Sequence, residues 1–414
     1  MIPLSYGRTP RQRDSADRES VRQIYLQELT MDYLLTEQQT MIRGLARKIA
    51  DEKIKPVAAH YDETEEFAWP IMKILAESDL FGVYLPEQYG GLGGGIMDMC
   101  LVTEELSRAC GGIALGYAGT GLGTLPILQH GSEEQKKKFL PAIASGKKLA
   151  AFCITEAEAG SDAGSIKTTA RKEGDKYILN GTKQWITNGG EAEIYTVIAS
   201  TDKTKGVRGA SAFIVEKGAK GLTFGKKEKK LGIRASATRE VIFTDCEVPA
   251  ENLISREGMG FIIAMKTFDS SRPGVAAQAV GIAQGALDHA VEYARTRVQF
   301  GQTISGFQAI QHMLADMGTQ VEAARALTYA TARMVDSGAK SVAKESAMAK
   351  LFASDTAMKV AVDAVQILGG YGYMREYPVE KYMRDAKITQ IYEGTNQIQR
   401  NIIAANMIKE NLKK

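Results

Sequence analysis

The stretch QIYEGTNQIQR, residues 390–400, places a single carboxylate, Glu393, between a tyrosine and a glycine. A carboxylate in apolar, amide-rich surroundings can serve as a general base, and a following glycine lets the backbone approach a ligand closely. A solvated residue at the start of a helix has the same pattern. The residue types therefore nominate Glu393 as a candidate base and leave that alternative open.

Two other stretches have residues suited to a flat or phosphorylated ligand. CITEAEAGSDAGS, residues 153–165, combines small residues with hydroxyls such as Thr155 and Ser161, so backbone N–H groups and hydroxyls can contact a ligand together. WITNGG, residues 185–190, has an indole and a threonine before a glycine turn, which suits a planar cofactor. A polar loop and a core tryptophan are the alternatives.

A third group of residues could bind phosphates. QILGGYGYMREYPVEKYMRD, residues 366–385, has three glycines in four positions between helical patterns, and Arg272 and Arg297 stand in FDSSRP and RTRVQFG. Arginine binds phosphate with two parallel hydrogen bonds. A helix corner and solvated arginines are the alternatives.

The elements that must position these residues fall into an α–β–α order. Helical periodicity predicts a helical domain over 31–149, short β-branched runs predict a β domain over 150–256, and helical patterns return over 257–414. Residues 1–30 are interpreted as an N-terminal extension. Within the β domain Asn180-Gly181 predicts a hairpin turn. In the last domain one buried helical stripe is predicted, formed by Met348, Leu351, Phe352, Met358, Val362 and Val365.

Composition narrows the function. The chain of 414 residues has 44% hydrophobic and 24% charged residues and a net charge of +3, so it predicts a soluble globular protein without a nucleic-acid partner. No apolar run is long enough to span a membrane. Four dispersed cysteines and four histidines indicate neither a disulfide framework nor a metal site, which favours a cytoplasmic location. The glycines at 90–95 lack the GxGxxG spacing of a dinucleotide-binding turn.

Together, CITEAEAGSDAGS and QILGGYGYMREYPVEKYMRD resemble two signatures of the acyl-CoA dehydrogenase family, and the resemblance covers nearly all of 31–410. It is nearest to short-chain, butyryl-CoA dehydrogenase-like bacterial members. The resemblance implies an α+β multidomain fold: an N-terminal α-helical domain, a middle β-barrel or sandwich domain and a C-terminal four-helix bundle. It also implies FAD as the cofactor, a homotetramer, and electron-transfer flavoprotein as the electron acceptor.

The resemblance also assigns roles residue by residue. Glu393 matches the catalytic base that removes the α-proton of the thioester, while a hydride leaves the β-carbon for FAD. In the isovaleryl-type branch the base precedes the arginine of the FDSSR region, where this chain has Ser271. The positions that match substrate contacts are Ser161, Asp269, Arg272 and Gly394. Those that match FAD contacts are Phe152, Cys153, Ile154, Thr155, Gly160, Ser161, Trp185, Ile186, Thr187, Arg297, Gln299, Phe300, Gln308, Gln366, Ile367, Leu368, Gly369, Gly370, Thr395, Asn396 and Gln397. The FAD contacts in this list from Arg297 to Gly370 are expected to bind the pyrophosphate and adenine of the FAD of a neighbouring subunit.

Two other activities remain open within this resemblance. An acyl-CoA oxidase shares the fold and the base but usually has a further C-terminal domain, whereas this chain ends at 414. The other alternative is a noncatalytic relative that binds acyl-CoA or DNA; a DNA-binding relative would need a basic tail or patch, which the net charge of +3 does not indicate. The substrate is expected to be a short, branched or cyclic acyl chain, because GGIALGYAGTGLGTLPILQHG, the expected acyl-pocket helix, is rich in glycine and alanine. Close helix packing would explain the same residues.

Overall fold

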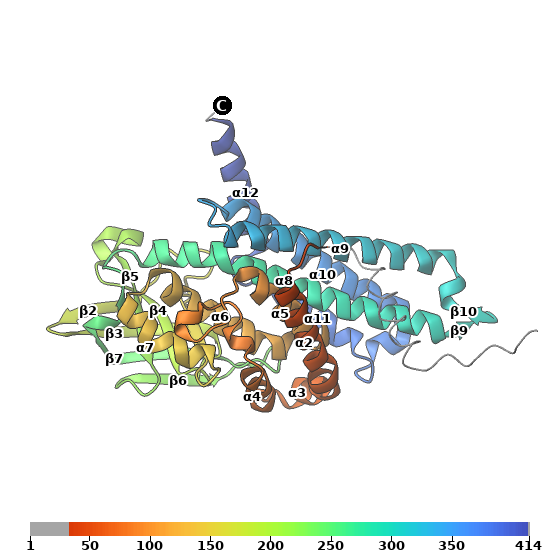
Figure 1. Cartoon of the computed structure of the whole chain (residues 1–414), viewed down its shortest axis with the longest axis horizontal. Helices are drawn as coiled ribbons and strands as arrows, with labels where there is room; N and C mark the ends of the chain where they lie inside the picture. Colours follow the sequence, from red (N-terminus) through yellow and green to blue (C-terminus); the bar gives the residue numbers. More distant parts are fainter. Residues whose placement is uncertain (1–32, 413–414) are drawn as a thin grey trace, which may run out of the picture. The chain divides into compact units, whose positions relative to one another are not determined.

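The computed structural model describes residues 33–412, so the expected extension over 1–30 lies outside the described residues. Its contacts separate Met1–Glu37 from Gln38–Lys414, and the second unit is described below. Its first part is helical (Figure 1), with α2 (Glu37–Ile49), α3 (Ala58–Thr64), α4 (Trp69–Glu77), α5 (Ile96–Ala109), α6 (Gly111–His130) and α7 (Glu133–Ala144).

The middle of the chain forms one mixed sheet. The strands are β1 (Ala150–Cys153), β2 (Thr169–Glu173), β3 (Lys176–Thr187), β4 (Ile194–Ser200), β5 (Ala210–Glu216), β6 (Leu222–Lys227), β7 (Thr238–Pro249) and β8 (Leu253–Ile254). They lie in the order β6-β7-β3-β2-β4-β5-β8, and β1 pairs with β4 in parallel. The ends of β1 and β3 lead into the two hydroxyl-bearing stretches, so this sheet positions both of them.

The hairpin predicted at Asn180-Gly181 is wrong. Both residues lie inside β3, where the register with β7 shifts between Leu179 and Gly181, and the turn of the hairpin is made instead at Gly174 between β2 and β3. A Cβ on Gly181 would lie 2.4 Å from the Thr168 hydroxyl oxygen. The glycine is therefore required by a β-bulge and not by a turn.

The last part of the chain is a helical bundle. Its elements are α8 (Gly260–Thr296), the short strands β9 (Val298–Gln299) and β10 (Gln302–Thr303), α9 (Gln308–Asp336), α10 (Ala343–Leu368), α11 (Val379–Thr389) and α12 (Asn396–Asn411). Helix α10 packs against α8, α9, α11 and α12, and the long helices run side by side in Figure 1. The predicted order of helical, β and helical domains is confirmed.

The stripe predicted on the helix now identified as α10 is wrong. Phe352 and Val362 are exposed, at 41% and 43%, whereas the buried face consists of small residues. Ala349, Ala353, Ala357, Ala361 and Ala364 pack there against the alanines of α8. Small side chains let two long helices approach each other closely. The alanine face of α10 is therefore buried against α8, although the larger apolar side chains had been predicted to be buried.

Candidate active site

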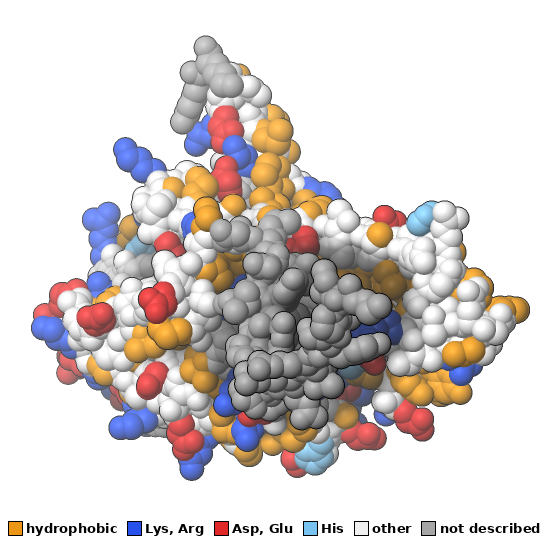
Figure 2. Space-filling view, turned by 45° about the vertical axis from the view of Figure 1, so that its right-hand side comes forward, with side chains coloured by type: hydrophobic (Ala, Val, Ile, Leu, Met, Phe, Trp, Pro, Cys, Tyr) orange, Lys and Arg blue, Asp and Glu red, His pale blue; other side chains and the backbone are white. Residues whose placement is uncertain are grey.

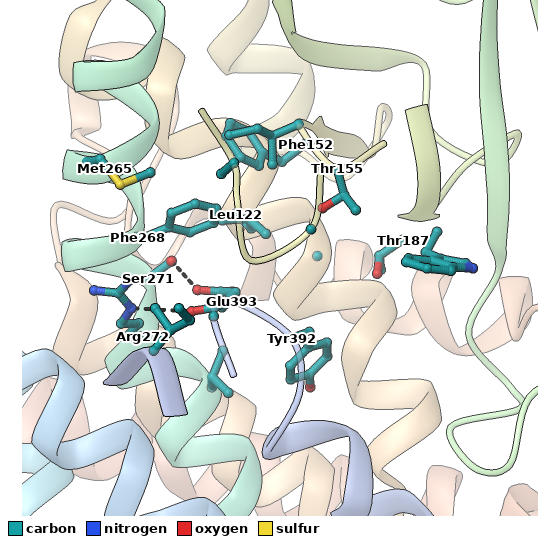
Figure 3. A pocket seen from close by; sticks show the side chains of 18 of the residues that line it. Leu122, Phe152, Thr155, Thr187, Met265, Phe268, Ser271, Arg272, Tyr392 and Glu393 are labelled. Atoms are coloured by element: carbon teal, nitrogen blue, oxygen red, sulfur yellow. Dashed lines mark hydrogen bonds between the residues drawn. The ribbon is translucent and has the colours of Figure 1, made fainter. Parts of the chain in front are cut away.

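A cavity of about 490 Å³ lies where the three parts of the unit meet. Helix α6 lines it with Leu115, Ala118 and Leu122, and α8 lines it with residues from Phe261 to Gln278. The ends of β1 and β3 and the loop between α11 and α12 complete its wall. Figure 3 shows Glu393 in this cavity, with Thr155 and Thr187 across from it.

Glu393 stands in the loop between α11 and α12 in an unusual backbone conformation. Its φ is +50° and that of Gly394 is +89°, so two consecutive residues lie in the left-handed region. For a non-glycine residue this region costs about 1–2 kcal/mol. Strain of this kind at a cavity wall is a common feature of functional sites, where surrounding contacts hold the residue in place.

Two residues of α8 contact Glu393. The Ser271 hydroxyl donates a hydrogen bond to a carboxylate oxygen, and Arg272 Nε donates to the Glu393 carbonyl oxygen at 3.4 Å (Figure 3). Arg272 also pairs with Asp269, with 3.2 Å between Nη1 and Oδ1. Ser271 and Glu393 lie more than 120 residues apart in the sequence, and the packing of the bundle brings them into contact.

The environment of Glu393 suits a base. Burial raises the pKa of its carboxyl, while the Ser271 hydrogen bond and the charges of Arg272 and Lys350 act in the opposite direction. A carboxylate whose pKa lies closer to neutral pH is a stronger proton acceptor. Within residues 33–412 no acceptor pairs with the backbone N–H of Glu393, so this donor is available to a ligand.

The cavity wall opposite Glu393 fits a flat, polar-edged ring. Thr155 and Thr187 bring hydroxyls to it, and the loop after β1 adds Gly160, Ser161 and Gly164. Trp185 is 55% exposed. Its backbone lies in the left-handed region, with φ +56°. An exposed aromatic face beside hydroxyl and backbone donors matches the chemistry of an isoalloxazine ring, so the residues present fit FAD.

A second hollow contains other predicted FAD contacts. Arg297, Gln299 and residues 367–370 line it together with Tyr293, Ile304, Tyr371 and Met374. The Arg297 guanidinium lies over the ring of Tyr371, 5.2 Å from the ring centre. A fixed guanidinium beside open glycine backbone suits a diphosphate. The two hollows have no lining residue in common.

Several predicted residues line neither hollow. Cys153 is buried, Asp269 faces Arg272, and Asn396 is buried with its amide donating to Ser354 and Asp355 of α10. Phe300 is 94% exposed with φ +52°. The other predicted FAD contacts that line neither hollow are Gln308, Gln366, Thr395 and Gln397.

Sequence reasoning missed part of the cavity wall and one buried cation. Met265 and Gln278 line the cavity outside any motif, whereas Leu122 and Phe268 lie in the expected acyl-pocket helix and in FDSSRP but were not predicted individually. Lys350 of α10 is fully buried below the Glu393 loop. A lysine on an otherwise Ala- and Ser-rich helical face was the one signal that could have identified it.

The described residues, 33–412, contain neither a cluster of metal-ligating side chains nor a membrane-spanning helix. No group of three or more His, Cys, Asp or Glu side chains there could hold a metal ion. No helix in that part of the chain has the length and apolarity needed to cross a membrane.

Models of one known protein family match most of this chain. Three family models match consecutive parts of the chain: acyl-CoA dehydrogenase N-terminal domain over 36–147, middle domain over 151–246 and C-terminal domain over 258–408. These matches cover most of the chain in the order expected of one family.

Individual relatives agree. An acyl-CoA dehydrogenase of Bacillus subtilis is 51% identical over 376 residues, which is 90% of this chain and 99% of the relative. A short-chain-specific acyl-CoA dehydrogenase of Clostridium acetobutylicum is 47% identical, covering 92% and 100%. The structure of butyryl-CoA dehydrogenase from Megasphaera elsdenii has a TM-score of 0.89 at 47% identity, covering 91% and 100%. A Bacillus anthracis acyl-CoA dehydrogenase solved with FAD has a TM-score of 0.86 at 38% identity, covering 92% and 68%.

Proposed function

The chain belongs to the acyl-CoA dehydrogenase family and is an FAD-dependent oxidoreductase acting on acyl-CoA, and from this premise we propose that it converts an acyl-CoA thioester to the 2-enoyl-CoA with Glu393 as the base. The observation that carries the proposal is a carboxylate of raised pKa that faces the hydroxyl-lined wall across a 490 Å³ cavity. In the FDSSR region Ser271 has no basic side chain, and the carboxylate of Asp269 pairs with Arg272 and does not line the cavity.

The residues divide the chemistry between them. Glu393 removes a proton from the α-carbon, and negative charge then develops on the thioester carbonyl oxygen. The unpaired backbone N–H of Glu393 can donate to that oxygen, and a lost oxyanion donor costs about 3–4 kcal/mol of transition-state stabilisation. FAD bound against the hydroxyl-lined wall would supply the acceptor for the hydride of the β-carbon. Leu122, Met265 and Phe268 exclude water from the acyl chain.

We assign FAD binding to two surfaces of different copies. In this assignment the isoalloxazine ring is held by the loop after β1 and by the end of β3, which carries Trp185, Ile186 and Thr187. Thr395 and Gln397 add further contacts to FAD. The hollow with Arg297 and residues 367–370 holds the diphosphate and adenine end of a neighbouring copy's FAD. The support is that the two hollows, each suited to one end of the cofactor, have no lining residue in common.

A homotetramer would provide such neighbours. Helix α12 carries exposed apolar side chains at Met407, Ile408 and Leu412. Figure 2 shows hydrophobic side chains along the helix that projects from the molecule. Exposed apolar surface of this kind favours contact with another chain. Electrons from the reduced cofactor must then leave the enzyme, and electron-transfer flavoprotein is the acceptor we propose.

The substrate is proposed to be a short acyl chain. Gly119 and Gly123 of α6 also allow close packing, because Cβ atoms on them would lie 2.7 Å from Thr187 Cγ2 and 2.5 Å from Ala151 N, so they do not by themselves indicate a branched substrate. The cavity wall combines small residues such as Ala118 and Gly119 with the large side chains of Leu122 and Phe268. The length of the acyl chain is therefore tested directly in the experiment below.

The decisive experiment is anaerobic addition of acyl-CoA thioesters, from butyryl to octanoyl and including isobutyryl and cyclohexanecarboxyl, to the purified holoenzyme. Bleaching of the visible flavin band by one of them supports the proposal and identifies its acyl class. If no thioester bleaches the band while FAD remains bound, the dehydrogenase proposal is wrong. Rapid reoxidation of the bleached enzyme by oxygen, with release of peroxide, would instead indicate an acyl-CoA oxidase.

A further inference from the structure

Lys350 lies directly below the loop that carries Glu393. It is on α10, is fully buried, and its Nζ donates to the Gly394 carbonyl oxygen at 2.9 Å and to Asn396 Oδ1 at 2.9 Å. Burying an ammonium costs free energy unless acceptors satisfy its hydrogen bonds. A buried lysine at this position therefore indicates that its contacts with the loop have a role. Both acceptors belong to the segment immediately after Glu393.

The loop requires such a restraint. Glu393 and Gly394 are both left-handed, and their carbonyl oxygens must be held for the side chain of Glu393 to stay in the cavity. Gln399 Nε2 donates to the same two carbonyl oxygens, at 3.1 and 2.8 Å, from α12. Arg272 of α8 donates to the Glu393 carbonyl oxygen at 3.4 Å, and Lys350 adds a charged donor from α10 to the Gly394 carbonyl oxygen.

Other α10 residues hold the far end of the loop. Asn396 Nδ2 donates to Ser354 at 2.9 Å and to Asp355 at 2.7 Å, and Gln390 Nε2 donates to Asp355 at 2.7 Å. Lys350 is therefore one part of a polar face of α10 that follows the loop from Gln390 to Asn396. Lys350 differs from Ser354 and Asp355 because it is a cationic donor and because it contacts the Gly394 carbonyl oxygen.

We propose that Lys350 is a positioning residue for the base: its ammonium holds the backbone at Gly394 in the left-handed turn and provides a positive charge below the Glu393 carboxylate. This inference rests on the proposed function, in which Glu393 removes the α-proton. Lys350 itself contacts neither carboxylate oxygen in the hydrogen-bond pattern, so it acts through the loop and through its charge.

The electrostatics agree with this geometry. Burial lowers the pKa of Lys350 to about 7, against the opposing effect of Glu393, and Arg272 on α8 lowers it further while Asp355 on α10 raises it. The charge on Lys350 in turn lowers the pKa of Glu393. Removing this charge should therefore raise the pKa of Glu393, so that the base becomes protonated at a higher pH.

The test compares the anaerobic rate of flavin reduction from pH 5.5 to 9 in wild type, Lys350→Met and Lys350→Gln holoenzymes. Lys350→Met removes the donors and the charge, and we expect a fall of about 10- to 100-fold in the limiting rate, since a misplaced base loses about that much. Its acid limb should move to higher pH. Lys350→Gln keeps an amide donor without the charge, so it should recover part of the rate but retain the displaced acid limb.

Tyr382→Phe provides a matched control for the loss of a buried donor. Tyr382 is buried and its hydroxyl donates to the carbonyl oxygens of Arg108 and Ala109, at 2.6 and 3.3 Å. This variant should lower the thermal midpoint and leave the acid limb where it is. Hydrogen exchange of peptides covering 390–396 gives a second readout without substrate, and it should be faster in Lys350→Met only.

The outcomes separate the two proposals. If the wild type is not reduced by any thioester, the proposed function fails and this inference fails with it. If the wild type is reduced but Lys350→Met has the same rate, acid limb and loop exchange, Lys350 is not a positioning residue and the proposed function stands. If Lys350→Met loses rate equally at every pH, as a general loss of stability would produce, the inference is also overturned.

Discussion

The Ser271 hydroxyl donates a hydrogen bond to a carboxylate oxygen of Glu393, which lies 122 positions further along the chain. The bond joins α8 to the loop between α11 and α12 and orients one oxygen of the proposed base, while the other oxygen remains available to the cavity. It also stabilises the charged form of a carboxylate whose pKa burial raises. A small hydroxyl therefore occupies the place where the isovaleryl-type branch is expected to carry its base.

Replacing Glu393 by glutamine should abolish flavin reduction. The amide keeps the size of the side chain but accepts no proton, so the reduction rate should fall by at least about 10²-fold. Anaerobic stopped-flow absorbance with the best thioester measures this rate. Glu410→Gln, on the exposed end of α12 where Glu410 pairs with Lys344, is the matched control and should reduce at the wild-type rate. Equal rates in both variants would exclude Glu393 as the base.

Ser271→Ala should shift the pH dependence of the reaction. Burial raises the pKa of Glu393 and the Ser271 hydrogen bond lowers it, so without the hydroxyl the base becomes protonated at higher pH. The acid limb of the reduction rate should therefore move upward, with a loss of about 10-fold near neutral pH, as expected for one hydrogen bond to a charged group. Ser270→Ala is the control, because Ser270 pairs with Gln129 instead. An unshifted acid limb would show that Ser271 does not tune the base.

Stability should also report on Glu393. Because its folded pKa is raised above the value of an unfolded glutamate, about 4.3, the folded protein holds this proton more tightly. The resulting stabilisation is fully present below the unfolded pKa and is lost as pH rises through the folded pKa. Glu393→Gln should therefore be more stable than wild type at pH 8, with the difference shrinking toward pH 4. Urea unfolding at both pH values measures this, and a difference that grows on acidification would contradict it.

Trp185→Ala should weaken FAD retention without unfolding the sheet. The indole is 55% exposed, so its removal leaves little cavity in the core, but a bound ring would lose its aromatic contact. We expect the dissociation constant of FAD to rise about 10-fold, measured by flavin fluorescence after gel filtration. The other tryptophan, Trp69, is 42% exposed and bonds to Glu191, so Trp69→Ala should keep its FAD. Equal retention by both variants would remove Trp185 from the cofactor site.

Arg297→Ala tests the second hollow. If Arg297 binds the diphosphate of a neighbouring copy's FAD, the variant should bind FAD at least about 10-fold more weakly, because a charge-assisted hydrogen bond is lost. Arg295→Ala is the control: Arg295 precedes it by two residues and pairs with Glu292 in solvent. A mixture of Arg297→Ala with Trp185→Ala subunits should recover part of the flavin content. Absence of recovery would indicate that both hollows serve the same copy.

Local sequence was sufficient for the order of helical, β and helical parts and for nominating Glu393 as a candidate base. The alternation of helical and strand periodicity follows from which residues can be buried on each element, so it survives without tertiary information. Glu393 next to Gly394 and the hydroxyls at Thr155 and Thr187 were nominated by residue type, and the structure brings all of them to one cavity. Their roles in FAD and substrate binding remain predictions.

Tertiary structure decided what local patterns could not. The same Asn-Gly pair that favours a hairpin became a bulge inside β3 because β7 pairs along it, and the buried face of α10 is set by the close approach of α8. Ser271 and Lys350 contact the Glu393 loop only because the bundle packs α8 and α10 against the segment between α11 and α12. A sequence specifies which groups can accept or donate a proton, whereas their distances, burial and therefore their pKa values arise only when distant helices pack together.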